Sequence, residues 1–161
     1  MSYQLTVQVS DHLLTLAQRV AYDLLWPPNG VPGFVHFGDG GALVSTGIAG
    51  GRVNVELRLL EAEPTIEPEL WEDIDEGDLV TETGSIRLTS GYEAKNYIPG
   101  GKDGLTPTGP SLHRVRVSAN GRALNYDLVT SDADTSESYL IEIWPTATPS
   151  GTIIIKHESG R

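Results

Sequence analysis

The sequence contains no cysteine, and this absence removes a whole group of structures and chemistries. Disulfide bridges, thiolate nucleophiles, iron–sulfur clusters and cysteine-type zinc sites are excluded. No apolar run reaches the roughly 18 residues of a membrane-spanning helix, and the first ten residues lack the basic and apolar regions of a signal peptide. We therefore expect a soluble, cytoplasmic protein, with residues 1–161 forming a single domain.

Basic side chains are also few. Eleven Lys and Arg stand against 22 Asp and Glu, which gives a formal net charge of −11 at pH 7. Such a charge disfavours binding to nucleic acid backbones and to anionic membranes, and it favours a basic protein partner. An acidic surface also serves solubility alone, so the charge by itself does not identify a partner.

Motifs of known chemistry are missing as well. The four histidines show neither the HxH nor the HExxH spacing of a zinc site, and no serine lies in a Gly-x-Ser-x-Gly elbow. The acidic run 73–78 resembles a calcium loop only superficially, because its glycine comes one position early and Gly84 stands where the last ligand would be. We expect no catalytic residue, no cofactor and no metal, and hence no enzyme.

What the chain does contain is a series of strand patterns. The clearest is Ser136–Pro145, in which Tyr139, Ile141 and Ile143 point to one face before a proline ends the ladder. The opposite face of this strand is largely apolar too. We therefore place it centrally in a sheet, with Trp144 closing one end of the core.

Further strand patterns follow one another along the whole chain, separated by turn residues. They lie at 5–9, 12–16, 34–37, 42–45, 53–59, 70–80, 85–89, 113–117, 124–128 and 152–156. Asn120-Gly121 predicts a hairpin between 113–117 and 124–128, and Gly84 predicts one between 70–80 and 85–89.

The segment 11–25 fits either a strand or a helix, and we favour a strand through Leu16 followed by at most one short helical turn. Short strands with turn signals between them are typical of an all-β fold. The predicted class is an antiparallel β-sandwich with a Greek-key or jelly-roll path and at most one short helix.

The segment Glu61–Glu82 holds ten acidic side chains and no Lys or Arg. Its apolar residues at 70, 74 and 80 predict a strand whose even positions face the core, and Gly77 predicts a bulge that admits Leu79. Trp71 has the opposite phase, so it lies either exposed among the carboxylates or packed on its own sheet. The acids themselves are expected to lie in solvent.

An exposed aromatic ring surrounded by acids is typical of a binding hot spot for a basic protein surface. On this interpretation the acidic stretch occludes the partner. The predicted partner-binding residues are Glu67, Glu69, Trp71, Glu72, Asp73, Asp75, Glu76 and Asp78.

The segment 91–110 is the one long stretch without periodicity, and loops of this length are usually functional. It carries Tyr92 and Tyr97. It therefore offers an alternative function, in which a jelly-roll module binds a small molecule or a carbohydrate beneath a lid formed by this loop.

The succession of strands also resembles known proteins. The stretches that carry the resemblance are Ala42–Ser45, Val53–Leu57, Trp71–Ile74, Gly84–Thr89, His113–Val117 and Glu137–Pro145. They look like a family of small actinobacterial β-proteins. In broader outline the chain is similar to the competence-nuclease inhibitor family, acidic bacterial proteins that bind and restrain a DNA-entry nuclease.

The likeness spans about residues 42–145, and the 91–110 loop departs from the inhibitor pattern. The resemblance implies a non-catalytic inhibitor or immunity-type protein, as in a toxin–antitoxin pair, which occludes a basic partner such as a nuclease or other toxin. It assigns no role to any residue and leaves the oligomeric state open.

Overall fold

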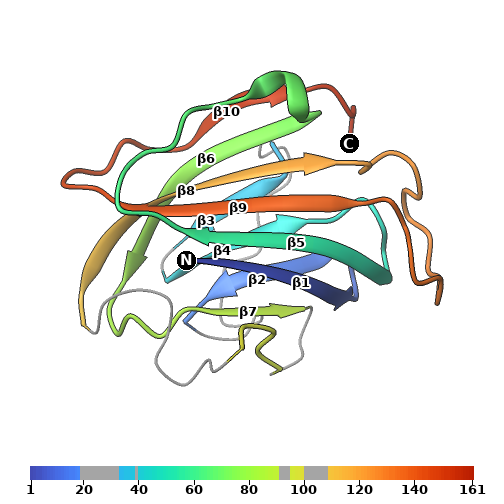
Figure 1. Cartoon of the computed structure of the whole chain (residues 1–161), viewed down its shortest axis with the longest axis horizontal. Helices are drawn as coiled ribbons and strands as arrows, with labels where there is room; N and C mark the ends of the chain where they lie inside the picture. Colours follow the sequence, from blue (N-terminus) through green and yellow to red (C-terminus); the bar gives the residue numbers. More distant parts are fainter. Residues whose placement is uncertain (19–32, 39, 91–94, 100–108) are drawn as a thin grey trace.

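Two β-sheets face each other in the structure (Figure 1), a computed structural model that describes residues 1–18, 33–38, 40–90, 95–99 and 109–161. The larger sheet has the order β1 (Ser2–Val9), β5 (Gly51–Leu59), β9 (Ser138–Pro145), β8 (Ser111–Asn120), β6 (Asp73–Thr81) and β10 (Ile153–His157). The smaller sheet has the order β3 (Val35–Gly38), β4 (Gly41–Ser45), β2 (Leu13–Ala17) and β7 (Arg87–Ser90). The predicted all-β sandwich is confirmed.

The hydrophobic core lies between the two sheets. β9 sits centrally between β5 and β8, as its pattern predicts, and directs Tyr139, Ile141 and Ile143 into this core. Trp144 faces the other way. Its ring lies 5.0 Å from the guanidinium carbon of Arg116, on the face of the larger sheet that points away from the smaller sheet. Trp144 is buried, at 4% exposure, but it does not belong to the core between the sheets, so the prediction that it closes one end of that core is wrong only in its placement.

The strand pairing differs from the prediction in two places. β5 and β9 run parallel, so the larger sheet is mixed rather than purely antiparallel. β7 pairs with β2 in the smaller sheet, so the hairpin predicted between 70–80 and 85–89 does not form. β6 instead pairs with β8 and β10.

The second predicted hairpin is also wrong, because residues 121–128 form turns rather than a return strand. Their alternating apolar side chains do not enter the core. Leu124 and Leu128 are each more than half exposed as a result.

Helical structure is confined, in the part of the chain that the structure describes, to the single 3₁₀ turn η2 (Pro68–Leu70). β2 confirms the strand predicted through Leu16. The helical turn predicted after it falls within residues 19–32, outside the described residues. No helix of the described part is both long and apolar enough to span a membrane.

The orientation of β6 is seen at Gly77, which faces the core. The register between β6 and β8 is unbroken, so the predicted bulge is absent and the odd positions face the core. Leu79 is buried for this reason, whereas Val80 is about half exposed. A Cβ atom added at Gly77 would lie 2.3 Å from the ring of Phe37, which packs directly on the bare backbone.

Replacing Gly77 by alanine is expected to lower the free energy of unfolding by about 1–3 kcal/mol, because the Phe37 ring must move. Urea denaturation measures this change. Gly38→Ala is the matched control, since a Cβ there would meet its nearest neighbour, the His36 ring, at an ordinary 3.7 Å. Equal stability of the two variants would contradict the close packing at Gly77.

Candidate functional site

Four charged side chains form a row across the outer face of the larger sheet, which is the face directed away from the smaller sheet. The strand register pairs Arg58 of β5 with Glu142 of β9. It pairs Glu142 in turn with Arg116 of β8, and Arg116 with Glu76 of β6. Cross-strand neighbours of opposite charge stabilise each other, and here the sign alternates over four adjacent strands.

A second row, the apolar row, lies two residues further along β9, β8 and β6, and two of its three residues are apolar. It pairs Leu140 of β9 with Ser118 of β8, and Ser118 with Ile74 of β6. Because side chains on one face recur every second residue, the charged row and the apolar row are neighbours on the outer face.

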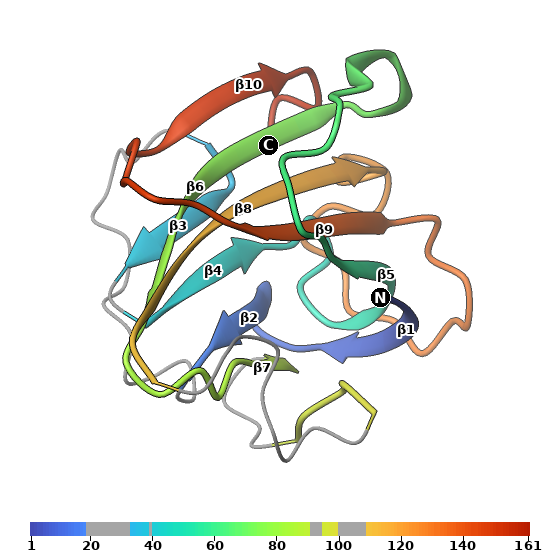
Figure 2. The same cartoon turned by 60° about the vertical axis from the view of Figure 1, so that its left-hand side comes forward.

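Residues 60–72, which we call the crossing segment, lead from β5 to β6 across this face (Figure 2). The carbonyl of Pro64 accepts a hydrogen bond of 3.0 Å from Nη1 of Arg116. The carbonyls of Pro68 and Trp71 accept bonds of 2.8 and 2.7 Å from Nζ of Lys156. Beneath this cover the side chain of Arg116 is only 1% exposed, although it lies on the outer face.

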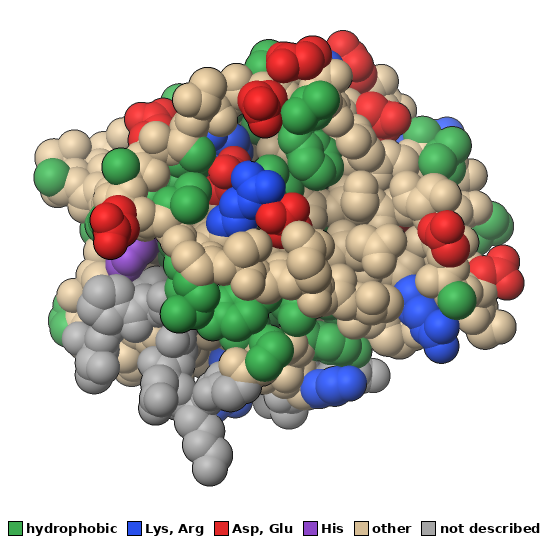
Figure 3. All heavy atoms as spheres, viewed as in Figure 1, with side chains coloured by type: hydrophobic (Ala, Val, Ile, Leu, Met, Phe, Trp, Pro, Cys, Tyr) green, Lys and Arg blue, Asp and Glu red, His purple; other side chains and the backbone are tan. Residues whose placement is uncertain are grey.

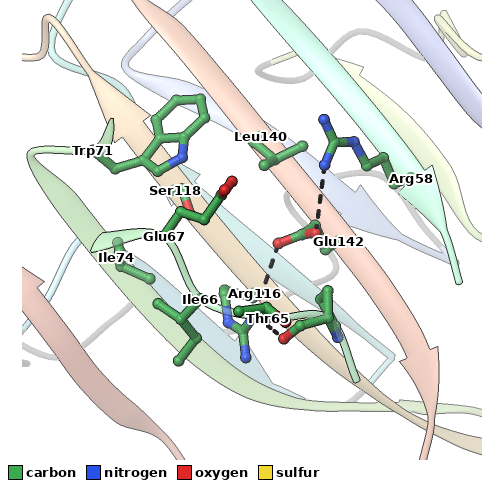
Figure 4. Close-up of a pocket in the computed structure, with 11 residues that line it drawn as sticks. Arg58, Thr65, Ile66, Glu67, Trp71, Ile74, Arg116, Ser118, Leu140 and Glu142 are labelled. Atoms are coloured by element: carbon green, nitrogen blue, oxygen red, sulfur yellow. Dashed lines mark hydrogen bonds and ion pairs between the residues drawn. The ribbon is translucent and has the colours of Figure 1, made fainter. Parts of the chain in front are cut away.

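A pocket of about 220 Å³ remains between the crossing segment and the sheet (Figure 4). Its floor is formed by the apolar row and by the charged row without Glu76. Ile66, Glu67 and Trp71 of the crossing segment form its wall, and the carboxylate of Glu67 projects between the Trp71 ring and Leu140. In the surface view, acidic side chains gather along the upper border of this face, and a basic group flanked by acids lies toward its middle (Figure 3).

Glu142 is the acid at the floor of the pocket. Its side chain is 7% exposed, and its oxygens lie 3.8 Å from Nη1 of Arg58 and 3.9 Å from Nη1 of Arg116. Both separations exceed hydrogen-bonding distance. Burial raises the pKa of Glu142, and the two guanidinium groups offset this only in part. The ionised carboxylate is therefore destabilised in the free protein.

Glu142→Gln is accordingly expected to raise the melting temperature at pH 7. A carboxyl whose folded pKa exceeds the unfolded value of about 4.3 costs stability as the pH rises through the folded pKa, and glutamine avoids that cost. The gain should disappear below about pH 4, where both states are protonated. Thermal unfolding monitored by circular dichroism at the two pH values tests this.

Glu56→Gln is the matched control for this measurement. A hydrogen bond of 2.7 Å from Nε of Arg58 holds the pKa of Glu56 below its usual value, so its loss should lower the melting temperature at pH 7. Changes of the same sign in both variants would contradict the assignment of Glu142 as the destabilised acid.

The structure divides the predicted partner-binding residues into a buried and an exposed group. Asp73 and Asp75 lie buried on the inner face of β6. Asp73 accepts bonds from Nη1 of Arg122 at 2.9 Å and from the N–H of Ser159 at 3.0 Å, and Asp75 accepts the N–H of Phe34 at 2.7 Å. Burial raises the pKa of Asp73, but its donors outweigh this and bring it below the ordinary value. The expectation that these two acids lie in solvent is wrong.

Glu76 and Asp78 lie on the outer face, but their carboxylates accept hydrogen bonds from other residues of this chain. Glu76 accepts bonds of 2.9 Å from Nε of Arg114 and from Nε of Arg116. Asp78 accepts Nη1 of Arg114 at 2.9 Å and the N–H of Gly151 at 2.8 Å. Burial acts to raise the pKa of Asp78, and these donors lower it by more. The two carboxylates thus neutralise the two guanidinium groups.

The remaining four predicted residues stay at least partly exposed. Two of them, Glu67 and Trp71, line the pocket, and Oε2 of Glu72 accepts the N–H of Gly121 at 3.2 Å. Glu67 and Glu69 are exposed, whereas Trp71 and Glu72 are half-buried. We call Glu67, Glu69, Trp71 and Glu72 the acidic rim. Trp71 lies between the two predicted alternatives, because its ring walls the pocket while part of it stays exposed.

The alternative site in the 91–110 loop is described only in part. Tyr97 packs against the core, and Nζ of Lys95 lies 4.5 Å from the centre of its ring. Tyr92 lies outside the described residues. Within the described residues, no group of three or more His, Asp or Glu side chains could hold a metal ion.

The fold and the site together define an all-β sandwich protein with a small surface pocket beside an acidic rim. No family model and no curated protein matches the chain. Two solved structures are similar to it at low sequence identity.

The first, described as "Crocagin biosynthetic gene J", has a TM-score of 0.55 at 14% identity, over 91% of this chain and 98% of that chain. The second is ComJ from Bacillus subtilis, an inhibitor of the DNA-degrading activity of NucA. It has a TM-score of 0.52 at 13% identity, over the same shares of the two chains. At these identities the likeness shows the fold alone. It supports the distant resemblance to the competence-nuclease inhibitor family as a resemblance of fold. The resemblance to actinobacterial proteins stays a prediction.

Proposed function

We propose that this protein is a non-catalytic, inhibitor- or immunity-type binding protein of the bacterial cytoplasm, which occludes a basic partner such as a nuclease or other toxin. The observation that carries the proposal is the acidic rim, in which Glu67 and Glu69 are exposed and Glu67 lines a pocket with an aromatic wall. An exposed aromatic supplies affinity on burial, and the surrounding charge speeds association with a basic surface. The net charge of −11 acts in the same direction.

The fold supports this proposal by analogy. ComJ, which shares the sandwich, inhibits a nuclease. An inhibitor of this kind needs a complementary surface but no catalytic constellation, and a rigid sheet covered by a bonded crossing segment provides such a surface.

The experiment starts by isolating the partner. Tagged protein is used to capture proteins from a lysate of the source organism, and a stoichiometric basic protein that elutes as the salt is raised is then purified and assayed, with nuclease activity tested first. Addition of one equivalent of this protein should abolish the partner's activity. A captured protein whose activity is unchanged at saturation would overturn the inhibitor proposal.

A further inference from the structure

The two arginines of the pocket are already paired with acids outside it. Nε of Arg116 donates to Glu76 at 2.9 Å, and its Nη2 donates to Glu63 at 3.4 Å. Nε of Arg58 donates to Glu56 at 2.7 Å. Each guanidinium therefore has a carboxylate partner at hydrogen-bonding distance without using the acids of the pocket.

The two acids of the pocket lack such partners. Glu142 faces the pocket with both oxygens beyond hydrogen-bonding distance of Arg58 and Arg116, although its side chain is more than nine-tenths buried. Within the described residues, no hydrogen bond or ion pair reaches the side chain of Glu67, which projects into the same space. Glu142 has ion pairs with Arg58 and Arg116 but accepts no hydrogen bond from the described residues, and Glu67 is exposed. Both carboxylates can therefore accept bonds from a further donor that enters the pocket.

Apart from Thr65 and Ser118, the rest of the pocket is apolar or aromatic. Trp71 presents its ring on one side, and Leu140, Ile66 and Ile74 line the space around it. An indole ring attracts a cation placed over its face, and apolar walls suit the methylene stem that carries such a cation. The volume of about 220 Å³ is below the roughly 300–1,000 Å³ of typical small-molecule sites, which favours a single side chain as the occupant.

We propose that the pocket is the anchor site for one arginine side chain of the partner protein, whose guanidinium binds the carboxylates of Glu142 and Glu67 and stacks on Trp71. A planar guanidinium can donate two parallel bonds to one carboxylate and lie flat on an aromatic ring, which an ammonium group cannot do. The inference rests on the proposed function and adds to it the chemical identity of the central contact.

The test uses the protein alone, with ethylguanidinium as the probe and neutral ethylurea as its matched control. In a ¹⁵N NMR titration, ethylguanidinium should shift the Trp71 indole N–H and the Ser118 amide with millimolar affinity, and ethylurea should not. Glu142→Gln, which we expect to be more stable than the wild type at pH 7, should weaken probe binding by about tenfold or more, because a charge-assisted bond is lost. Absence of these shifts, equal shifts with ethylurea, or unchanged affinity of Glu142→Gln would overturn the inference.

The titration is independent of whether a partner exists. Failure of the probe to bind, together with inhibition of a captured partner, would remove the arginine anchor and leave the proposed function in place. If the probe binds but the captured partner is not inhibited, the cation site stands and the proposed inhibitor function is removed.

Discussion

Replacing Glu76 by alanine is expected to lower the free energy of unfolding by about 3–5 kcal/mol, the largest effect that we expect from removing one side chain of the acidic segment. Glu76 is buried and accepts a hydrogen bond from both Arg114 and Arg116, whose side chains are almost wholly buried. Without it, among the described residues, Arg114 keeps only the carboxylate of Asp78, and Arg116 keeps only the longer carboxylate contacts with Glu63 at 3.4 Å and Glu142 at 3.9 Å. Chemical denaturation of the purified variant at neutral pH measures the loss.

Glu69→Ala is the matched control, since it removes an exposed acid of the same segment and should change stability by no more than about 0.5 kcal/mol. A Glu76 variant as stable as the Glu69 variant would show that the charged row does not hold the outer face together. The result also decides which substitutions can test binding. Replacing Asp73, Asp75 or Glu76 is expected to destabilise the fold, so a loss of binding in these variants would not identify a contact with the partner.

Replacing Trp71 by alanine is expected to weaken partner binding by about 2 kcal/mol or more, which is about 30-fold in Kd. The ring forms a wall of the pocket and lies within the acidic rim, so the variant loses both the contact area of the indole and the platform for the anchoring cation. Isothermal titration calorimetry with the purified partner measures the change, and circular dichroism verifies the fold of the variant.

Leu124→Ala is the control for this substitution, because Leu124 is a large exposed apolar residue in the turns after β8 and does not line the pocket. Its affinity for the partner should equal that of the wild type. Loss of affinity in this variant with none in the Trp71 variant would move the binding surface from the acidic rim to the 121–130 turns.

The strands were predictable because their apolar residues alternate, and β5 and β9 lie where the pattern places them. Their pairing was less predictable. Sequence proximity favours a hairpin between β6 and β7, but Leu88 of β7 is buried opposite Leu16 of β2 in the smaller sheet. In β6 the few apolar residues point to both faces. The alternation alone therefore predicts that the even positions face the core, whereas the odd positions do. The inward face carries Asp73, Asp75 and Gly77, none of which is apolar.

The pocket was not predictable for a related reason. Alternation places Arg58, Arg116 and Glu142 on one face of the sheet, and that much can be inferred from the sequence. Their burial depends on the crossing segment, which has no periodicity and is held by carbonyl contacts such as that of Pro64 with Arg116. The sequence alone therefore favours a solvated surface for the acidic stretch, although five of the eight predicted binding residues, Glu72 included, bind other parts of the fold.

We claim that the acidic rim receives the basic partner, and the association rate of the partner as a function of salt concentration decides this. Wild type is compared with the double variant Glu67→Lys/Glu69→Lys and with Glu82→Lys/Asp132→Lys, which changes the net charge equally at two exposed acids that do not line the pocket. We expect the rim variant to associate more slowly at low salt and to lose most of its salt dependence, while the control pair stays close to wild type. Equal slowing in the two double variants would contradict the claim, because net charge rather than this rim would then direct the partner.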